Sequence, residues 1–245
     1  MFYLAPGETE RKQRQNLDWQ KRYQQLANKA KSPLLKRYYE AGITAASTPI
    51  SDVPLVAVDF ETTGLDAKQH SIVSIAVVPM TLSRIQLAGA QQWMVKPKHE
   101  LTEESITIHG ITHSAIASAP DLETIIEPLL EAVAGKVWVV HYNGVERPFL
   151  QAGLLDRLAE TLHFPLIDTM EIEARFHRQG QSLWDKLLRR KPLSIRLGDS
   201  RTRYNLPYYA PHDALTDALA CGELFQAQVA HHFSADTPLG ELWLP

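Results

Sequence analysis

Apolar and polar positions follow different periods along this 245-residue chain, and the changes of period divide it into elements. A thin apolar stripe over residues 10–31, which contain no Gly or Pro, predicts one amphipathic helix. Ser32-Pro33 interrupts the stripe and starts a second short helix, residues 34–41, which Gly42 ends. Residues 43–52 then lead as a linker into a strongly apolar run.

Short apolar runs rich in β-branched residues predict five strands, at residues 55–58, 71–79, 85–95, 136–140 and 164–168. The first three follow one another closely, which predicts an antiparallel meander. Helical periods follow at residues 122–134, 145–162 and 211–231. The order predicts an α/β fold, in which a mixed five-stranded sheet is flanked by helices.

This pattern predicts three parts: a basic helical extension with its linker (1–52), a main domain (53–235) and a short tail (236–245). Residues 1–50 hold nine Lys/Arg and four Asp/Glu, which leaves 16 basic and 24 acidic residues for the rest of the chain. The net charge of −3 therefore hides a basic arm on an acidic body. The arm could grip phosphates, dock on a partner protein or on the domain behind it, or be a solvated extension packed by its aromatics.

The composition excludes some locations. The single Cys221 cannot form an internal disulfide, which fits a reducing compartment. The chain shows no run of 18 apolar residues and no signal-peptide core at its start. We therefore expect a cytoplasmic protein without a membrane partner.

Two carboxylates lie at the end of the first strand. Asp59 and Glu61 are two residues apart, so a strand presents both on one face and turns Phe60 to the other. Like charges this close are costly to ionise unless a cation lies between them. Oxygen ligands favour Mg²⁺ or Mn²⁺, although a solvated strand end also explains such a pair.

Two later segments offer further ligands. Glu146 follows the fourth strand in the first turn of the next helix, a position where acidic residues are common. Asp217 lies one turn into the last helix, and His212 precedes that helix. A histidine near neutral pKa beside a metal site is a natural general base, while His212 alone could equally be a surface residue near a helix cap.

Together these segments resemble the DEDDh family of 3′–5′ exonucleases, which includes the proofreading ε subunit of bacterial DNA polymerase III. Val58-Asp-Phe-Glu-Thr-Thr-Gly-Leu65 is similar to the first family motif, and Ile108-His-Gly-Ile-Thr112 to a recurring segment after it. Tyr204-Asn-Leu-Pro through Ala218 is similar to the third motif. The resemblance covers about residues 53–230 and implies a ribonuclease H-like fold.

The resemblance also implies roles for individual residues. Asp59, Glu61, Glu146 and Asp217 would bind two divalent ions, Mg²⁺ or Mn²⁺, and His212 would be the general base. Contacts to the 3′-terminal nucleotide would come from Thr62, Thr63, Gly64, Leu65, His109 and Phe149. The implied activity is hydrolysis of terminal phosphodiesters in single-stranded nucleic acid, with DNA favoured over RNA.

The second motif departs from the family pattern, because Glu146 replaces the usual Asp and Tyr142 the usual Asn. One alternative is therefore a catalytically weakened nucleic-acid or nucleotide-binding module that acts through its N-terminal arm; another is an exonuclease of short RNA. Asp168 resembles a recurrent family acid and is expected to order a loop, and His141 is expected to be structural. Basic residues from Arg175 to Lys191 either follow the phosphate backbone or form a solvated helix face.

Overall fold

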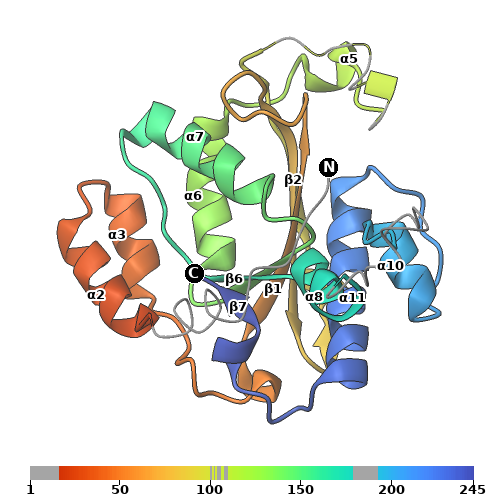
Figure 1. The fold of residues 1–245 in the computed structure, drawn as a ribbon. Helices are drawn as coiled ribbons and strands as arrows, with labels where there is room; N and C mark the ends of the chain where they lie inside the picture. The colour runs from red at the N-terminus through yellow and green to blue at the C-terminus, as the bar shows by residue number, and fades with distance from the viewer. Residues whose placement is uncertain (1–16, 100, 102, 104–105, 108–109, 179–192) are drawn as a thin grey trace, which may run out of the picture.

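A mixed sheet runs through the middle of the computed structural model (Figure 1), which describes residues 17–99, 101, 103, 106–107, 110–178 and 193–245. The seven strands have the order β3-β2-β1-β5-β6-β7, and β4 also pairs with β2. Their bounds are β1 Leu55–Thr62, β2 Ile72–Thr81, β3 Arg84–Ile85, β4 Gln91–Met94, β5 Val137–Val140, β6 Leu166–Asp168 and β7 Trp243–Leu244. The mixed sheet is thus confirmed, while the predicted number of five strands is wrong.

The strand directions gather three carboxyl ends at one edge of the sheet. β2 lies antiparallel to β1, and β5 and β6 run parallel to β1. The expected meander of the first three runs is confirmed, because β4 also lies antiparallel to β2. Parallel strands end on the same side, so residues that follow β1, β5 and β6 can meet there.

The predicted third strand, residues 85–95, is divided in two. Residues Leu87–Gly89 form a 3₁₀ turn between β3 and β4, opposite Pro79 of β2. Pro79 has no N–H to donate to a ladder, so continuous pairing fails at that point. The sheet accommodates this by a turn whose Gln86 N–H still donates to the Pro79 carbonyl, at 2.9 Å.

The strand β7 lies in the segment that was predicted to be a short tail. Trp243 and Leu244 pair with Ile167 and Leu166 of β6 and are buried. Two residues are too few for a period to reveal a strand. The segment therefore covers the edge of β6, which would otherwise present unpaired backbone groups.

Helices cover both faces of the sheet (Figure 1). On one side lie α6 and α7, with α2 and α3 outside them, and on the other lie α10 and α11. The described helices are α2 Trp19–Lys29, α3 Pro33–Glu40, α5 His113–Ile116, α6 Leu122–Val133, α7 Glu146–Leu158, α8 Thr169–His177, α10 Leu197–Arg203 and α11 Ala214–His232. Among the described residues, no helix is long and apolar enough to cross a membrane.

The helix α11 lies close to the sheet because its inner face carries small residues. Ala214 and Ala218 are fully buried, and a Cβ on Gly222 would come within 3.4 Å of the Ala57 Cβ and 3.0 Å of the Met80 sulfur. Larger side chains would push the helix away from β1 and β2. This close approach brings the first turn of α11 to the end of β1.

The N-terminal hairpin, which comprises α2 and α3, belongs to the same hydrophobic core as the sheet. Trp19, Tyr23, Tyr38 and Tyr39 are buried, and their rings pack edge-on or tilted at centroid distances of 5.2–6.1 Å. Of the alternatives for the basic arm, docking on the domain behind it therefore holds for residues 17–50. Residues 1–16 lie outside the described part of the chain.

Polar contacts fix the hairpin in place. The Glu160 carboxylate accepts hydrogen bonds from the backbone N–H groups of Lys31 and Ser32, which directly precede α3, and Ser32 makes no side-chain cap of its own. The His163 N–H donates to the Tyr39 hydroxyl at 2.9 Å, and Arg37 pairs with Glu127 of α6. These contacts tie α3 and the link before it to α6 and to the segment after α7.

We predict that Tyr23→Ala lowers the free energy of unfolding of the whole protein by about 3–5 kcal/mol, because it deletes a buried aromatic ring. Urea unfolding followed by circular dichroism measures this change. The matched control is the exposed neighbour Gln24→Ala, which should change stability by less than about 0.5 kcal/mol. Two separate unfolding transitions, with only the first affected, would show that the hairpin is not part of the common core.

Candidate active site

The end of β1 presents the first two candidate ligands. Asp59 lies opposite Ala76 and Glu61 opposite Ser74, so both carboxylates share one face of the sheet, and Phe60 is buried on the other. The pairing register shifts between Glu61 and Thr62, which marks a β-bulge. Bulges of this kind redirect the chain and are frequent beside active sites.

The start of α11 supplies the next two residues. Asp213 caps the helix by accepting from the Thr216 N–H at 2.8 Å, so α11 begins at Ala214 and not at Pro211 as the sequence predicted. Asp217 lies in the first turn, and its Oδ2 accepts from the His212 N–H at 2.7 Å. His212 has a φ of 71°, a left-handed conformation that this hydrogen bond helps to hold.

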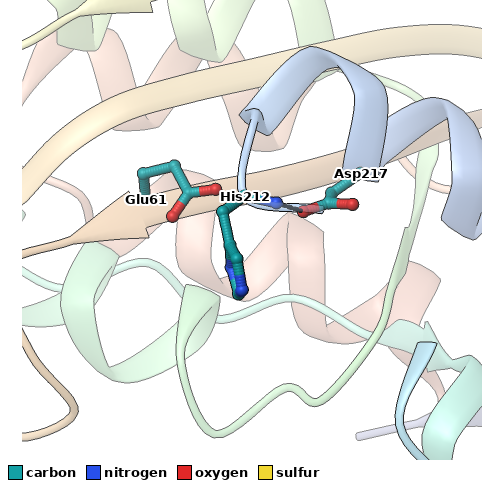
Figure 2. A group of neighbouring side chains, drawn as sticks. All are labelled: Glu61, His212 and Asp217. Atoms are coloured by element: carbon teal, nitrogen blue, oxygen red, sulfur yellow. Dashed lines mark hydrogen bonds between the residues drawn. The ribbon is translucent and has the colours of Figure 1, made fainter. Parts of the chain in front are cut away.

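These elements converge on one point. One ligand atom each of Glu61, His212 and Asp217 lies within 4.8 Å of the others. Figure 2 shows Glu61 on its strand, Asp217 on the first turn of the helix and His212 on the segment that leads into it. Residues about 150 positions apart in the sequence thus form one group of oxygen and nitrogen donors.

The carboxylates of Asp59 and Glu146 interact electrostatically with the carboxylates of this group. Burial raises the pKa of Asp59 well above its ordinary value, and the charges of Glu146, Glu61 and Asp217 raise it further. Burial also raises the pKa of Glu61 to about 7, together with the charges of Asp217 and Asp213. The pKa of Asp217 is raised mainly by burial, although the His212 N–H opposes the shift.

Glu146 is the most deeply buried of the four carboxylates, with 2% of its surface exposed. Burial raises its pKa well above the ordinary range, and the charges of Asp168 and Glu61 add to the effect. Its Oε2 has no hydrogen-bond partner among the described residues. A buried carboxylate oxygen without a donor is costly, so this position fits a cation ligand.

The loop before Glu146 is held by Asp168. The Asp168 carboxylate accepts from the N–H groups of Tyr142 at 3.0 Å and Asn143 at 2.9 Å, and it also caps α8 through Met170. Tyr142 has a φ of 86°, and a Cβ on Gly144 would lie 2.6 Å from its ring. Asp168 therefore orders the loop, as expected. His141 is bound by Thr169 at 2.8 Å and by the Ile195 carbonyl, which agrees with a structural role.

The described residues that were predicted to contact the substrate lie in two parts of the structure, the end of β1 with the loop after it and the helix α7. The Thr62 hydroxyl donates to the Gly64 carbonyl at 2.7 Å, and the Thr63 hydroxyl accepts from the Ser71 N–H, so both shape the loop after β1. A Cβ on Gly64 would meet the His70 ring at 2.4 Å. Leu65 is 76% exposed and points away from the core.

Phe149 is buried on α7, where it lines a cleft of about 610 Å³. The cleft lies between the β1–β2 connection, the segment after β4 and α7, and Lys68, Lys96 and Lys98 are among its lining residues. Lys98 pairs with Asp156 at 2.6 Å, which fixes one wall. His109, the last predicted contact, lies outside the described residues.

Two residues of the site were missed by the sequence reasoning. Asp213 adds negative charge near Asp59 and Glu61, and its signal was the capping pattern Asp213-x-x-Thr216 directly before an apolar helix. His70, which covers Gly64, has no sequence signal because its role depends on the fold. In the predicted basic run, Arg175 and Arg178 donate to the carbonyls of Glu241 and Leu193, and Lys186 to Lys191 lie outside the described residues.

The mixed sheet of this order, with the acidic cluster at the end of its first strand, has the ribonuclease H-like fold. The exonuclease family RNase_T matches residues 56–225, and the chain belongs to this family. The expectation of an exonuclease is thereby confirmed, and the fold agrees with that of a DEDDh family member.

The individual similarities are distant. The chain is 27% identical over 180 residues to DNA polymerase III subunit epsilon of Treponema pallidum. The matched region covers 74% of this chain and 78% of that protein. It is 29% identical over 183 residues to a DNA polymerase III subunit epsilon-like protein of Rhodobacter capsulatus, with 74% of this chain but only 24% of that protein covered. The nuclease domain of 3′hExo, a DEDDh family member bound to rAMP, has a TM-score of 0.59 at 14% identity, with 78% and 96% of the two chains covered.

We predict that Glu61→Gln stabilises the metal-free protein in a pH-dependent way. The pKa of Glu61 is raised from its ordinary 4.5 to about 7, so its contribution to stability is complete below pH 4.5 and is lost as the pH rises through 7. The variant cannot ionise at this position. Its thermal midpoint in EDTA should therefore exceed that of the wild type increasingly from pH 5 to pH 8.

The control for this prediction is Asp236→Asn, an exposed carboxylate after α11. Its thermal midpoint should stay close to that of the wild type, because substitutions of exposed side chains change stability little. Addition of Mg²⁺ at pH 8 should remove the advantage of Glu61→Gln, because the cation then compensates the charges of the wild type. A pH-independent difference for Glu61→Gln would contradict the account.

Proposed function

We propose that this exonuclease removes nucleotides from the 3′ end of single-stranded DNA, with two divalent ions bound by four carboxylates and with His212 as general base. The observation that carries the proposal is the convergence of Glu61, His212 and Asp217 within 4.8 Å. Asp59 and Glu146, whose pKa values are raised by burial and by neighbouring carboxylates, extend this group into the protein.

The donor set fits hard divalent ions. Asp59, Glu61, Glu146 and Asp217 offer only oxygen atoms, which Mg²⁺ and Mn²⁺ prefer, and the partnerless Oε2 of Glu146 offers a free one. Divalent ions bound there would polarise the phosphodiester and stabilise the charge that develops on its oxygens. The side chain of Glu146 brings its carboxylate close to Asp59, because its charge raises the pKa of Asp59. Its length is therefore compatible with this role.

His212 is suited to take a proton. Its backbone is fixed on Asp217, while its side chain is exposed and lies beside the carboxylates. In the proposed step, a water oxygen forms a bond to the terminal phosphorus, the bond from phosphorus to the 3′ oxygen breaks, and the imidazole accepts the proton of the water. The products are a nucleoside 5′-monophosphate and a strand shortened by one nucleotide.

The loop after β1 and the neighbouring cleft supply the contacts to the nucleotide. In this proposal the exposed Leu65 packs against the terminal base, and Gly64, Thr62 and Thr63 contact it through backbone and hydroxyl groups; the exposure of Leu65 supports this. Cationic Lys68 and Lys96 on the cleft favour a polyanion. DNA is proposed over RNA because relatives of this chain are named as DNA polymerase III epsilon subunits.

The alternative of a weakened binding module is not favoured. All four carboxylates and His212 are present and grouped, and the N-terminal hairpin is packed in the core. A protein partner on the exposed, polar face of α2, which includes Gln24, Gln25 and Asn28, remains part of the proposal, as does a cytoplasmic location.

We predict that His212→Ala lowers turnover by roughly 10²–10⁴-fold, because it removes the proton acceptor. The assay follows a 5′-labelled 20-nucleotide DNA in Mg²⁺ or Mn²⁺ and, in parallel, the matched RNA. The wild type should give a metal-dependent ladder of products, and calorimetry should show that the variant still binds Mn²⁺. His163→Ala, beside the N-terminal hairpin, is the control and should retain activity. A missing ladder with both DNA and RNA would refute the proposed function.

A further inference from the structure

The two most exposed large hydrophobic side chains of the described residues both lie near the carboxylate site. Tyr208 is 84% exposed and Leu65 is 76% exposed, whereas the others reach 56% at most. Leu65 follows Glu61 by four residues, and Tyr208 precedes His212 by four residues. Four residues of extended chain span at most about 14 Å, so Tyr208 cannot be far from the site.

The chain on both sides of Tyr208 is firmly attached to the protein. The Pro207 carbonyl accepts from Arg201 Nη2 at 2.9 Å. The Tyr209 ring lies under the Arg201 guanidinium, 4.5 Å from its centroid, and the Tyr209 hydroxyl donates to Glu223 Oε1 at 3.0 Å. The Pro207 carbonyl and the Tyr209 side chain are thus bound to the protein, while the Tyr208 ring between them is exposed to solvent.

Arg201 is the centre of this attachment and is 3% exposed. It donates to the Ala220 carbonyl at 2.7 Å and pairs with Glu223 at 2.7 Å, both on α11. A buried guanidinium with this many partners holds a single geometry. The loop from Tyr204 to His212 is therefore anchored on the same helix that carries Asp217.

An aromatic ring that is exposed on a fixed loop is well suited to stacking. Ordering a flexible loop costs free energy on binding, and here the backbone of the loop is already ordered before the base binds. The loop residues 205–211 contain no charged side chain, so they offer a ring face and not a phosphate contact. Unpaired bases of any sequence present a face to such a ring.

We propose that Tyr208 is a stacking platform for an unpaired base on the 5′ side of the scissile phosphate. This inference rests on the proposed function and deepens it, because it assigns a preference for single-stranded 3′ ends to one residue. The terminal nucleotide lies at Leu65, and the preceding strand passes over Tyr208. A base that is paired in a duplex cannot offer the same face without unpairing.

The test compares a substrate with upstream bases and one without them, using the full chain. The first is single-stranded dT20, and the second is the p-nitrophenyl ester of thymidine 5′-monophosphate. Tyr208→Ala should raise KM for dT20 by roughly 5- to 150-fold, the range that loss of one base–aromatic stack implies, with kcat unchanged. Activity on the ester should stay at the wild-type level.

Further variants separate stacking from other causes. Tyr208→Phe and Tyr208→Trp should behave like the wild type, whereas Tyr208→Leu should behave like Tyr208→Ala. The KM ratio should be the same at 50 and 200 mM salt, because no phosphate contact is lost. Leu87→Ala, at another exposed side chain, is the matched control and should change neither the KM for dT20 nor the activity on the ester.

Several outcomes would overturn the inference. An unchanged KM for dT20 in Tyr208→Ala would overturn it and would point instead to a protein contact at Tyr208. An equal loss of activity on the ester would also overturn it, because it would place the residue in the cleavage site itself. Anisotropy of labelled dT20 in Ca²⁺ measures the same contact without turnover. If the wild type binds in a Tyr208-dependent way but cleaves neither substrate, the proposed function fails and the platform stands.

Discussion

The repulsion among four clustered carboxylates is the constraint on which this structure depends. Asp59, Glu61, Glu146 and Asp217 come from one strand and two helices, and each has a pKa raised by burial. No local preference of the chain would hold them together. The fold does so through the core behind them, above all through the close packing of α11 on β1, which the small Gly222 permits. The destabilising repulsion is concentrated at one place, where a bound cation can offset it.

Hydrogen bonding separates the acids that support the fold from those that form the site. Asp168 has donors around both oxygens, and it shapes the loop before Glu146. Burial alone would raise the pKa of Glu173, but hydrogen bonds from Arg203, Gln228 and Tyr204 outweigh it and lower that pKa. Glu146, by contrast, has an oxygen without a partner among the described residues. Equally buried carboxylates thus have opposite roles, which the number of their donors distinguishes.

The sequence was sufficient for those parts of the fold and site that depend on local patterns. Alternation placed Asp59 and Glu61 on one face, and the apolar runs located β1, β2, β5 and β6. It was insufficient where a distant partner decides the outcome. Pro79 interrupts the pairing of a neighbouring strand, and β7 exists only because β6 offers an edge. The docking of the N-terminal hairpin likewise depends on contacts such as Glu160 with Lys31, 129 residues apart.

The central claim is that all four carboxylates, including Glu146, hold divalent ions at the end of β1. Anomalous diffraction from crystals soaked in Mn²⁺ tests this most directly, because it locates the ions without relying on activity. The account predicts two manganese peaks, which together contact Asp59, Glu61, Glu146 and Asp217. No peak at this position, or peaks that leave Glu146 without a contact, would contradict it.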